Sequence, residues 1–340
     1  MNSVAVLGAG SWGTALARLL SDKGIETSLW ARDEAFAKEL AVRRENRKYL
    51  PGFGLASTLG ITSSVAEAVQ GKDVILFVVP SHAMRETASA VSEALAGRPR
   101  PKAAVSCAKG IENDTLETMT DVLSEVFSPL GTISLGVLSG PSFAKEVAQR
   151  MPTAVTIAAH GEEVAKGLQE FFSTDFFRVY TTQDVIGVQL GGAVKNVLAI
   201  AAGISDGLGF GTNTRAALIT RGLAEMSRLG LKLGANPLTF AGLAGLGDLV
   251  LTCTGDLSRN RQVGLQLGAG KGMEEILASM NMVAEGVKTS RSLYMLSRRH
   301  QVEMPIIEHV YRVIYEGMSP RDAVKGLLDR PQKYELHGVH

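Results

Sequence analysis

The sequence has few cysteines, almost no net charge and no long apolar run. Its 340 residues include only two cysteines, Cys107 and Cys253. That number indicates no disulfide framework and favours a reducing compartment. There are 35 basic and 34 acidic residues, a formal charge of +1. No overall field draws such a chain towards nucleic acid, so we expect no nucleic-acid partner. Any phosphate must be bound by a few well-placed cations.

The apolar segments predict neither a membrane span nor a secretory signal. The longest apolar runs, such as Val74–Val79, fall far short of the ~20 residues that cross a bilayer. No basic segment precedes the first β-branched run, Ser3–Leu7, whereas a secretory signal begins with one. We therefore expect a cytoplasmic protein with no membrane insertion.

The chain length predicts about two domains, at ~150 residues each. The first half alternates short β-branched runs with amphipathic stretches, a pattern typical of βαβ units and a parallel sheet. The amphipathic stretch from Thr14 to Lys23 puts its apolar residues on one helical stripe. Strands are predicted at Ser3–Leu7, Thr27–Trp30, Val74–Val79, Ala103–Ser106, Ile133–Leu138 and Ala154–Ala158.

The pattern changes near residue 185, after which helical periodicity replaces the strand runs. The predicted fold class is therefore α/β, with a Rossmann-like doubly wound sheet domain over residues 1–186 and an all-helical domain over residues 187–340. Gly207–Gly211 and Gly242–Gly247 are predicted loops between helices. The predicted helices are Val185–Gly203, Asn213–Leu229, Pro237–Leu243, Arg259–Leu267, Met273–Ala278, Val287–Arg299, Pro305–Tyr315 and Pro320–Leu328.

A glycine-rich motif, Gly8-Ala9-Gly10-Ser11-Trp12-Gly13, follows the first strand and opens a helix. In a dinucleotide-binding loop the first glycine allows the tight turn, the second the approach of the pyrophosphate and the third close helix–strand packing. The helix N-terminus then offers N–H groups to the phosphates. The alternative is a glycine-rich turn with no ligand, but the strand before it and the helix after it favour a dinucleotide site.

The end of the second predicted strand bears on the choice between NAD and NADP. An NAD-selective site places Asp or Glu there for the ribose hydroxyls, whereas this chain has Trp30, then Arg32 and Asp33. A neutral residue followed by arginine suits a 2′-phosphate, so NADP is expected to be preferred over NAD. The alternative is that Arg32 is a solvated loop cation.

Polar residues follow two further strands of the predicted sheet. Lys109 lies just beyond the strand Ala103–Ser106, at the edge where open α/β sheets bind ligands. Cys107 has no histidine near it in sequence and is interpreted as a small core residue. Gly140 makes a turn, and Ser142 is predicted either to cap a helix that starts at Phe143 or to bind a ligand.

Lys195 stands in an apolar helical stretch with almost no other charge between Gln189 and Ser205. A buried ammonium is costly without a partner, and Gly191 and Gly192, one turn earlier, allow another backbone or a ligand to come close. Burial and a neighbouring cation both lower the pKa of a lysine towards the range useful for proton transfer. Lys195 is therefore the predicted general acid/base, and the alternative is a lysine whose amine reaches the surface.

Three more segments of the helical half carry candidate residues. Asp248 is another isolated charge, suited to holding a lysine or accepting from a substrate hydroxyl. Ser258, Arg259 and Asn260 open a helix and together predict a phosphate site, and the alternative is an N-cap with exposed arginines. Glu285 precedes a predicted helix and suits either a cofactor hydroxyl or simple helix initiation.

The motifs GAGSWGTA, CAKGIE, LSGPSFAKEV, GGAVKN, GLGDLVLTC and SRNR occur in this order, and together they resemble the bacterial-type NAD(P)-dependent glycerol-3-phosphate dehydrogenases. The resemblance runs from Val4 to about Leu328. It implies reversible hydride transfer between NAD(P)H and dihydroxyacetone phosphate to give sn-glycerol 3-phosphate for glycerophospholipid synthesis, with Lys195 as proton donor or acceptor. It also implies a small-molecule substrate, a homodimer and a cytoplasmic location, with no metal. Asp33, in place of a second basic residue, leaves NADP preference less firmly implied.

The resemblance assigns site residues by motif. The resemblance implies catalysis by Lys195, and the positions of Lys109 and Asp248 in the sequence make them the other predicted catalytic residues. The substrate contacts it implies are Lys109, Gly140, Ser142, Lys195, Asp248, Ser258, Arg259 and Asn260. The cofactor contacts it implies are Ser11, Trp12, Arg32, Lys109, Ala144, Arg259, Val283 and Glu285, and the glycine motif adds Gly8, Gly10 and Gly13. Two alternatives stay open at this point, a related dehydrogenase of a hydroxy acid such as a 6-phosphogluconate-like substrate and a nucleotide sensor without turnover.

Overall fold

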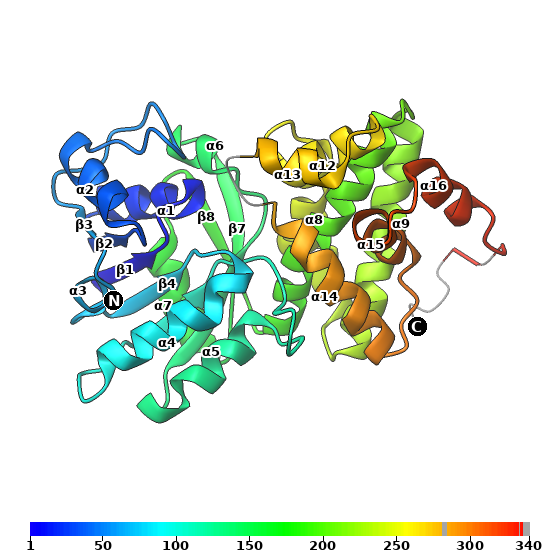
Figure 1. Cartoon of the computed structure of the whole chain (residues 1–340). Coiled ribbons are helices and arrows are strands. Elements are labelled where there is room, and N and C mark those ends of the chain that lie inside the picture. Colours follow the sequence, from blue (N-terminus) through cyan, green and yellow to red (C-terminus); the bar gives the residue numbers. More distant parts are fainter. Residues whose placement is uncertain (281–283, 333, 336–340) are drawn as a thin grey trace. The chain divides into compact units, whose positions relative to one another are not determined.

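The computed structural model describes residues 1–280, 284–332 and 334–335, and it divides into two compact units (Figure 1). The first unit is Met1–Ala108 with Met119–Val185, and the second is Lys109–Thr118 with Ile186–His340. The boundary predicted from sequence lay between residues 186 and 187. Segment Lys109–Thr118, which the sequence prediction assigned to the first domain, packs instead with the second unit.

The first unit contains one eight-stranded sheet in the order β3-β2-β1-β4-β5-β6-β7-β8. Every neighbouring pair is parallel except β6 and β7, which are antiparallel. This is the doubly wound order of dinucleotide-binding sheets, extended at one edge. The strands are β1 Ser3–Leu7, β2 Glu26–Trp30, β3 Gly60–Thr62, β4 Val74–Phe77, β5 Ala103–Ser106, β6 Ser134–Ser139, β7 Thr153–Ala159 and β8 Phe177–Thr182.

Helices cover both faces of this sheet. Because side chains alternate along a strand, Val4 and Val6 of β1 belong to one hydrophobic core, and Ala5 and Leu7 belong to another. The first core also takes α1 and α7, and the second takes α4 and α5. The helical elements are α1 Ser11–Asp22, α2 Glu34–Arg43, α3 Val65–Val69, η1 Ser81–Ala83, α4 Met84–Leu95, α5 Met119–Phe127, η2 Ser128–Leu130, α6 Ala144–Ala148 and α7 Glu162–Phe172.

From Ile186 onward, the regular secondary structure among the described residues of the second unit is helical, as predicted from sequence; the separate segment Lys109–Thr118 instead carries an antiparallel bridge between Ile111 and Thr118. The core of this unit surrounds α8, whose residues from Leu190 to Ala202 are buried. The elements are α8 Val185–Gly207, α9 Thr212–Lys232, α10 Pro237–Phe240, η3 Leu243–Gly247, α11 Asp248–Thr254, α12 Arg259–Gly268, α13 Met273–Ser279, α14 Glu285–Arg299, α15 Pro305–Tyr315 and α16 Pro320–Leu328.

Two helical stretches are longer and more apolar than the sequence prediction allowed. Val185–Gly207 and Pro237–Thr254 each have the length and mean hydropathy of a membrane-crossing helix. The apolar window of the first is 94% buried, as expected of a helix at the centre of a protein core, which passes the same test of length and composition. The expectation that all apolar runs are too short was therefore wrong for these two stretches.

Other local predictions were also wrong. Residues 243–247, predicted as a loop, form a π-helical turn that leads directly into α11. The π turn avoids steric conflict because glycines allow close approach: a Cβ on Gly245 would lie 2.2 Å from the Phe240 carbonyl oxygen. The edge strand β3 and the strand β8 were not predicted at all. The first has only three residues, and the second carries Arg178 within it.

Candidate active site

The glycine motif lies where the sequence predicted it, between β1 and α1. Gly8 has φ of +120°, and a Cβ there would meet the Val78 carbonyl oxygen at 2.6 Å. A Cβ on Gly13 would lie 1.8 Å from the Gly8 carbonyl oxygen. The first glycine is therefore required by its positive φ and by the backbone that follows β4, and the third by the backbone of the turn itself, in the roles expected of a dinucleotide-binding loop.

Gly10 differs from its neighbours because a Cβ there would meet nothing within 4 Å. It is the N-cap of α1 and has no side chain to bond the first turn. Open space next to a helix N-terminus suits a phosphate group, which takes hydrogen bonds from backbone N–H groups and is stabilised by the helix dipole. The residues present therefore fit the pyrophosphate of a nicotinamide dinucleotide, with Ser11 and Trp12 following in the first turn.

A buried asparagine outside the motif holds this loop in shape. Asn46 is fully buried, and its Nδ2 donates to the Ala9 carbonyl at 2.9 Å and to Thr14 Oγ1 at 2.7 Å. Its Oδ1 accepts from the Tyr49 N–H at 3.0 Å, and the Ser11 hydroxyl donates to the Tyr49 carbonyl at 2.6 Å. Asn46 was not predicted from sequence, since it sits among charged residues that look like a solvated face.

The two loop glycines give a matched pair of variants. We expect Gly10→Ala to leave the melting temperature unchanged but to raise the Kd for NADPH on the order of tenfold or more, because its methyl group fills the phosphate space. Gly13→Ala should lower both the melting temperature and NADPH affinity, since its methyl group collides with the Gly8 carbonyl. NADPH fluorescence titration and thermal melting check both. Equal NADPH affinity in Gly10→Ala and wild type would contradict the phosphate assignment.

The segment after β2 carries the residues on which the predicted choice between NADP and NAD depends. The Gly8 N–H donates to the Trp30 carbonyl, so the ends of β1 and β2 lie side by side. Arg32 is exposed just beyond Trp30. Asp33 caps α2, with its Oδ1 accepting from the Phe36 N–H at 2.6 Å. The Asp33 carboxylate is therefore engaged as the cap of α2.

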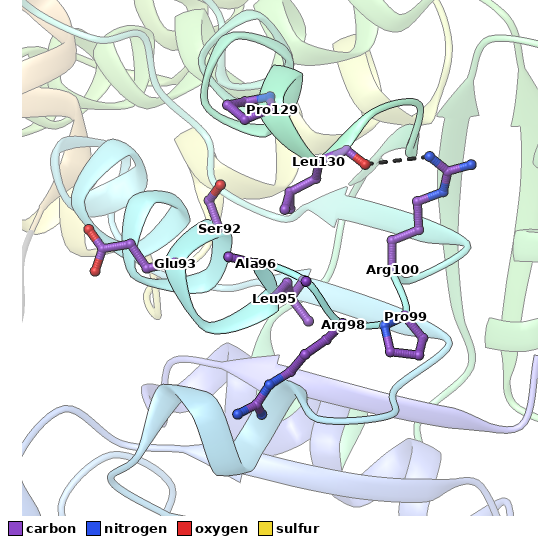
Figure 2. A pocket seen from close by; sticks show the side chains of 10 residues that line it. Ser92, Glu93, Leu95, Ala96, Arg98, Pro99, Arg100, Pro129 and Leu130 are labelled. Carbon is purple, nitrogen blue, oxygen red and sulfur yellow. Dashed lines mark hydrogen bonds between the residues drawn. The ribbon is translucent and has the colours of Figure 1, made fainter.

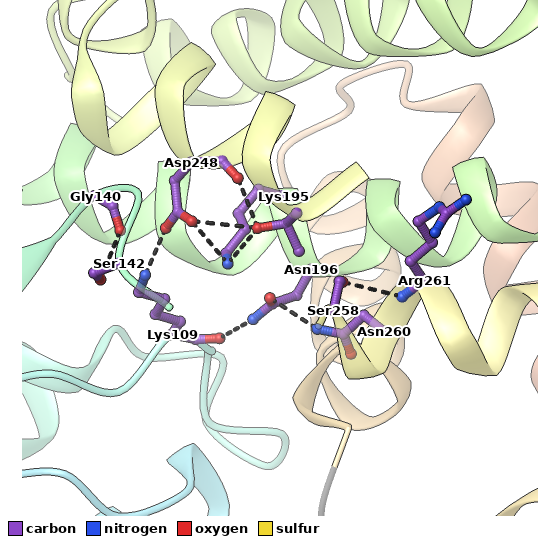
Figure 3. A network of polar contacts seen from close by, with 10 residues as sticks. Lys109, Gly140, Ser142, Lys195, Asn196, Asp248, Ser258, Asn260 and Arg261 are labelled. Atoms are coloured by element: carbon purple, nitrogen blue, oxygen red, sulfur yellow. Dashed lines mark hydrogen bonds and ion pairs between the residues drawn. The ribbon is translucent and has the colours of Figure 1, made fainter. Parts of the chain in front are cut away.

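The second unit brings together three residues predicted from sequence, and Figure 3 shows them around one carboxylate. Asp248, at the start of α11, is 1% exposed. Its Oδ2 lies 2.5 Å from Lys109 Nζ, and its Oδ1 lies 3.0 Å from Lys195 Nζ of α8. Lys195 Nζ also donates to Thr252 Oγ1 at 2.8 Å, and the Thr252 hydroxyl donates to the Asp248 carbonyl. The cluster holds two lysines on one aspartate and has a net charge of +1 when all three are ionised.

The electrostatics of this cluster set the protonation of Lys195. Burial lowers its pKa from 10.5 to about 8; Asp248 opposes the shift and Lys109 adds to it. Burial by itself would raise the pKa of Asp248, but the charges of Lys109 and Lys195 hold it below its ordinary value. Asp248 is therefore ionised at neutral pH, while Lys195 gains and loses a proton near pH 8.

Lys195 reaches this position because α8 lies directly against the π-helical turn. A Cβ on Gly191, one turn earlier, would meet the Ala244 carbonyl oxygen at 2.4 Å. The close backbone approach predicted for this glycine is confirmed, and the turn leads into Asp248. The side chain of Lys195 is 8% exposed, so the alternative of an amine that reaches the surface is wrong.

An amide bridge links the lysine cluster to α12 (Figure 3). Asn196 Nδ2 donates to the Lys109 carbonyl at 2.9 Å, and its Oδ1 accepts from Asn260 Nδ2 at 2.9 Å. Asn260 Oδ1 in turn accepts from the Gly286 N–H at 3.0 Å. Ser258 is the N-cap of α12, with its hydroxyl accepting from the Arg261 N–H. Neither Asn196 nor Thr252 was predicted from sequence, because short polar residues beside an apolar run give no periodic signal.

The remaining predicted residues have mixed outcomes. Arg259 is exposed on the first turn of α12, and the Glu285 carboxylate acts on it electrostatically. Gly140 follows β6 with φ of +132°. Ser142 does not cap the next helix; its hydroxyl donates to the Gly140 carbonyl at 3.0 Å, and Phe143 is the N-cap of α6. Ala144 is half-buried at the start of that helix. Val283 lies outside the described residues.

One hollow in the first unit contains none of the predicted site residues. A hollow of about 680 Å³ between the end of α4 and η2 is lined by residues that include Arg98, Arg100 and Leu130 (Figure 2).

Among described residues, no group of three or more His, Cys, Asp or Glu side chains could hold a metal ion. Cys107 and Cys253 are buried in the cores of different units and form no disulfide within the described residues.

A doubly wound sheet with a glycine loop, together with a helical unit that holds two lysines on one buried aspartate, defines a dinucleotide-dependent dehydrogenase. The family model for the N-terminus of NAD-dependent glycerol-3-phosphate dehydrogenase matches residues 3–165, and that for its C-terminus matches residues 184–325. The chain therefore belongs to the NAD-dependent glycerol-3-phosphate dehydrogenase family, which makes it an oxidoreductase that uses NAD(P).

Individual relatives agree with this assignment. The glycerol-3-phosphate dehydrogenase [NAD(P)+] of Citrifermentans bemidjiense is 56% identical over 332 residues, 98% of each chain. That of Syntrophobacter fumaroxidans is 53% identical over 338 residues, 99% of this chain and 98% of its own. The crystal structure of glycerol-3-phosphate dehydrogenase from Coxiella burnetii has a TM-score of 0.92 at 41% identity, covering 97% of this chain and 99% of its own.

Proposed function

We propose that this chain interconverts dihydroxyacetone phosphate and sn-glycerol 3-phosphate with NAD(P), and that Lys195 is its general acid/base. The observation that carries the proposal is the buried cluster in which Asp248 holds both Lys195 and Lys109. An enzyme that reduces a ketone must deliver a proton to a developing alkoxide. A lysine with a pKa of about 8 is suited to that transfer at neutral pH.

The protein's own residues have separate tasks in this scheme. When bound, the reduced nicotinamide supplies the hydride to C2. Lys195 donates its proton to the C2 oxygen, and Lys109 places a second positive charge near the same oxygen or the substrate phosphate. These cations stabilise a growing negative charge more than a neutral ketone, which is the condition for acceleration. Asp248 holds both amines in place without neutralising the pair.

The rest of the proposed contacts hold substrate and cofactor. Ser258, Arg259 and Asn260 at the start of α12 are the proposed binding site for the substrate phosphate, because a helix N-terminus and a guanidinium both favour a dianion. Gly140 and Ser142 are proposed to complete the substrate site. The proposed cofactor residues are Gly8, Gly10, Ser11, Trp12, Gly13, Arg32, Lys109, Ala144, Arg259, Val283 and Glu285.

The pKa of Lys195 gives the direction of the pH dependence. Ketone reduction needs the protonated amine, so kcat/KM for dihydroxyacetone phosphate should fall as pH rises through about 8. Alcohol oxidation needs the neutral amine, so kcat/KM for sn-glycerol 3-phosphate should rise over the same range. Initial rates in both directions from pH 6 to 10 check this. Profiles that move in the same direction would contradict a lysine that exchanges the proton.

We propose a preference for NADP over NAD. Support comes from the segment after β2, where exposed Arg32 follows neutral residues and the carboxylate of Asp33 is engaged as a helix cap. The ratio of kcat/KM for NADPH to that for NADH should exceed one, and Arg32→Ala should lower that ratio. A ratio that does not change in Arg32→Ala would show that this arginine does not select the cofactor.

The test of the function is an assay of NADPH and NADH oxidation with dihydroxyacetone phosphate. We expect oxidation of the reduced cofactor with dihydroxyacetone phosphate. We expect no reduction of the oxidised cofactor with a 6-phosphogluconate-like hydroxy acid. Tight NADPH binding without any oxidation would point instead to a nucleotide sensor and overturn the proposal.

We further propose a role in glycerophospholipid synthesis, a cytoplasmic location and a homodimer, as the family resemblance implies. The product sn-glycerol 3-phosphate is the three-carbon unit on which acyl chains are esterified. Depletion of the protein should therefore produce a growth defect that added glycerol 3-phosphate relieves. Sedimentation analysis should give twice the mass of the 36.0 kDa chain, and a monomer would contradict the dimer.

A further inference from the structure

A buried ion pair joins the end of α8 to the beginning of α12. Asp206 lies on the last turn of α8, and its side chain is 6% exposed. Its Oδ2 accepts from Arg261 Nε at 3.0 Å and lies 2.9 Å from Arg261 Nη2. Its Oδ1 accepts two bonds from Arg215 of α9, at 2.9 and 2.7 Å. Arg261 also bonds Asp256 at 2.9 Å, but that partner is 92% exposed.

The same two helices are in backbone contact over two further turns. A Cβ on Gly203 of α8 would meet the Arg261 carbonyl oxygen at 2.1 Å, and one on Gly207 would meet that of Leu265 at 2.3 Å. In return, a Cβ on Gly264 would meet the Ile200 carbonyl oxygen at 2.1 Å, and one on Gly268 that of Ile204 at 2.4 Å. Glycines four residues apart on each helix therefore let α8 and α12 pack without side chains between them.

This contact fixes the position of the lysine cluster on α8 relative to the first turn of α12. Lys195 and Asn196 lie on α8, about three turns before Asp206, and Ser258–Asn260 open α12. The Asn196–Asn260 hydrogen bond joins the two helices near the lysine cluster. Arg261 is itself part of the α12 N-terminus, because its N–H donates to the Ser258 hydroxyl. Helices that pack through glycines have no interdigitating side chains to stop one helix from sliding along the other. A guanidinium that bonds a carboxylate through two nitrogens fixes the relative position of the two helices that carry them.

We infer that Asp206 and Arg261 are positioning residues that set the register of α12 on α8, and thereby place Ser258, Arg259 and Asn260 to take the phosphate of the substrate. The inference rests on the proposed function. In the proposed function, neither Asp206 nor Arg261 contacts the substrate. Asp206 acts through Arg261, and Arg261 acts through the first turn of α12. The pair therefore determines how strongly the enzyme prefers a phosphorylated ketone to the same ketone without phosphate.

The experiment compares dihydroxyacetone phosphate with unphosphorylated dihydroxyacetone in three enzymes. Asp206→Asn keeps the shape of the side chain and removes the charge that both arginines share. We expect it to lower kcat/KM for dihydroxyacetone phosphate at least tenfold, mainly through KM, and to change kcat/KM for dihydroxyacetone less than twofold. Asp256→Asn is the matched control, because it removes the exposed partner of the same arginine. It should change neither value more than twofold.

A second variant covers the possibility that Asp206→Asn folds poorly. Arg261→Lys keeps a cation beside Asp206 but loses the planar fork, and we expect the same selective loss, in smaller degree, with a melting temperature near that of wild type. Equal losses with both ketones in a folded variant would indicate a merely structural role and overturn the inference, as would no loss with either. Wild-type enzyme that fails to turn over dihydroxyacetone phosphate would overturn the proposed function, and the inference with it.

Discussion

Replacing Lys195 with methionine should lower kcat for dihydroxyacetone phosphate by ~10²–10⁴, the usual contribution of a general acid. Methionine fills a similar volume, and the buried Asp248 keeps its 2.5 Å ion pair with Lys109. The variant should therefore fold, and its Kd for NADPH should stay close to that of wild type. Stopped-flow turnover and NADPH fluorescence titration measure the two quantities separately.

Two further variants show whether proton transfer is the cause. Lys166→Met removes an exposed lysine paired with Glu162 and should leave turnover unchanged. Lys195→Arg keeps a positive charge, but arginine does not release its proton in this pH range, so kcat should stay low. Wild-type turnover in the arginine variant would show that charge alone suffices and that Lys195 transfers no proton.

How far the sequence predicted this site depended on whether a residue stood out from its surroundings. Lys195 and Asp248 are isolated charges in apolar stretches, and burial of such charges requires partners. Each was therefore expected to have one, and each is the other's partner. The glycine motif was predictable for a related reason, since its spacing is imposed by backbone contacts such as that of Gly13 with Gly8.

The residues that sequence did not predict are held by partners far away in the chain. Asn46 and Arg261 each sit among other polar residues, where burial leaves no mark in the local pattern. Arg261 is 9% exposed because Asp206, 55 positions away, receives it. Whether such a polar residue is buried depends on its tertiary contacts, which the local sequence pattern does not show.

Secondary structure followed the same rule. The strands of the buried sheet centre were predicted because both of their faces are apolar, which gives continuous β-branched runs. The exception was at the edges, where β3 is three residues long and β8 alternates buried and exposed positions around Arg178. Ser142 was predicted as a possible helix cap from its residue type, but its hydroxyl bonds the Gly140 carbonyl of its own turn instead.

Replacing Asp248 with asparagine should be the most destabilising single change in the site. It leaves the buried Lys195 and the partly buried Lys109 without the carboxylate that lies 3.0 and 2.5 Å from their amines. Breaking a buried pair in this way costs about 3–5 kcal/mol, because a buried charge is left uncompensated. We expect a loss of that size in the free energy of unfolding at pH 7, measured by urea denaturation. Asp256→Asn, at an exposed ion pair, should cost less than about 1 kcal/mol.

The pH dependence of this loss follows from which form of Lys195 is buried. Asp248 raises the pKa of Lys195 against the effect of burial, so its removal should take that pKa below about 8, while the unfolded chain keeps the ordinary value of 10.5. Between these values the unfolded state binds more protons, and stability rises with pH. The wild type gains stability in the same way only above about pH 8, so the deficit of Asp248→Asn should be smaller at pH 9 than at pH 7. The double variant with Lys195→Met should also be more stable than Asp248→Asn alone, since it removes one of the two unpaired cations. Two outcomes would contradict a stabilising role of the Asp248 carboxylate toward the two amines. One is a stability deficit of Asp248→Asn that grows with pH, and the other is a double variant less stable than Asp248→Asn.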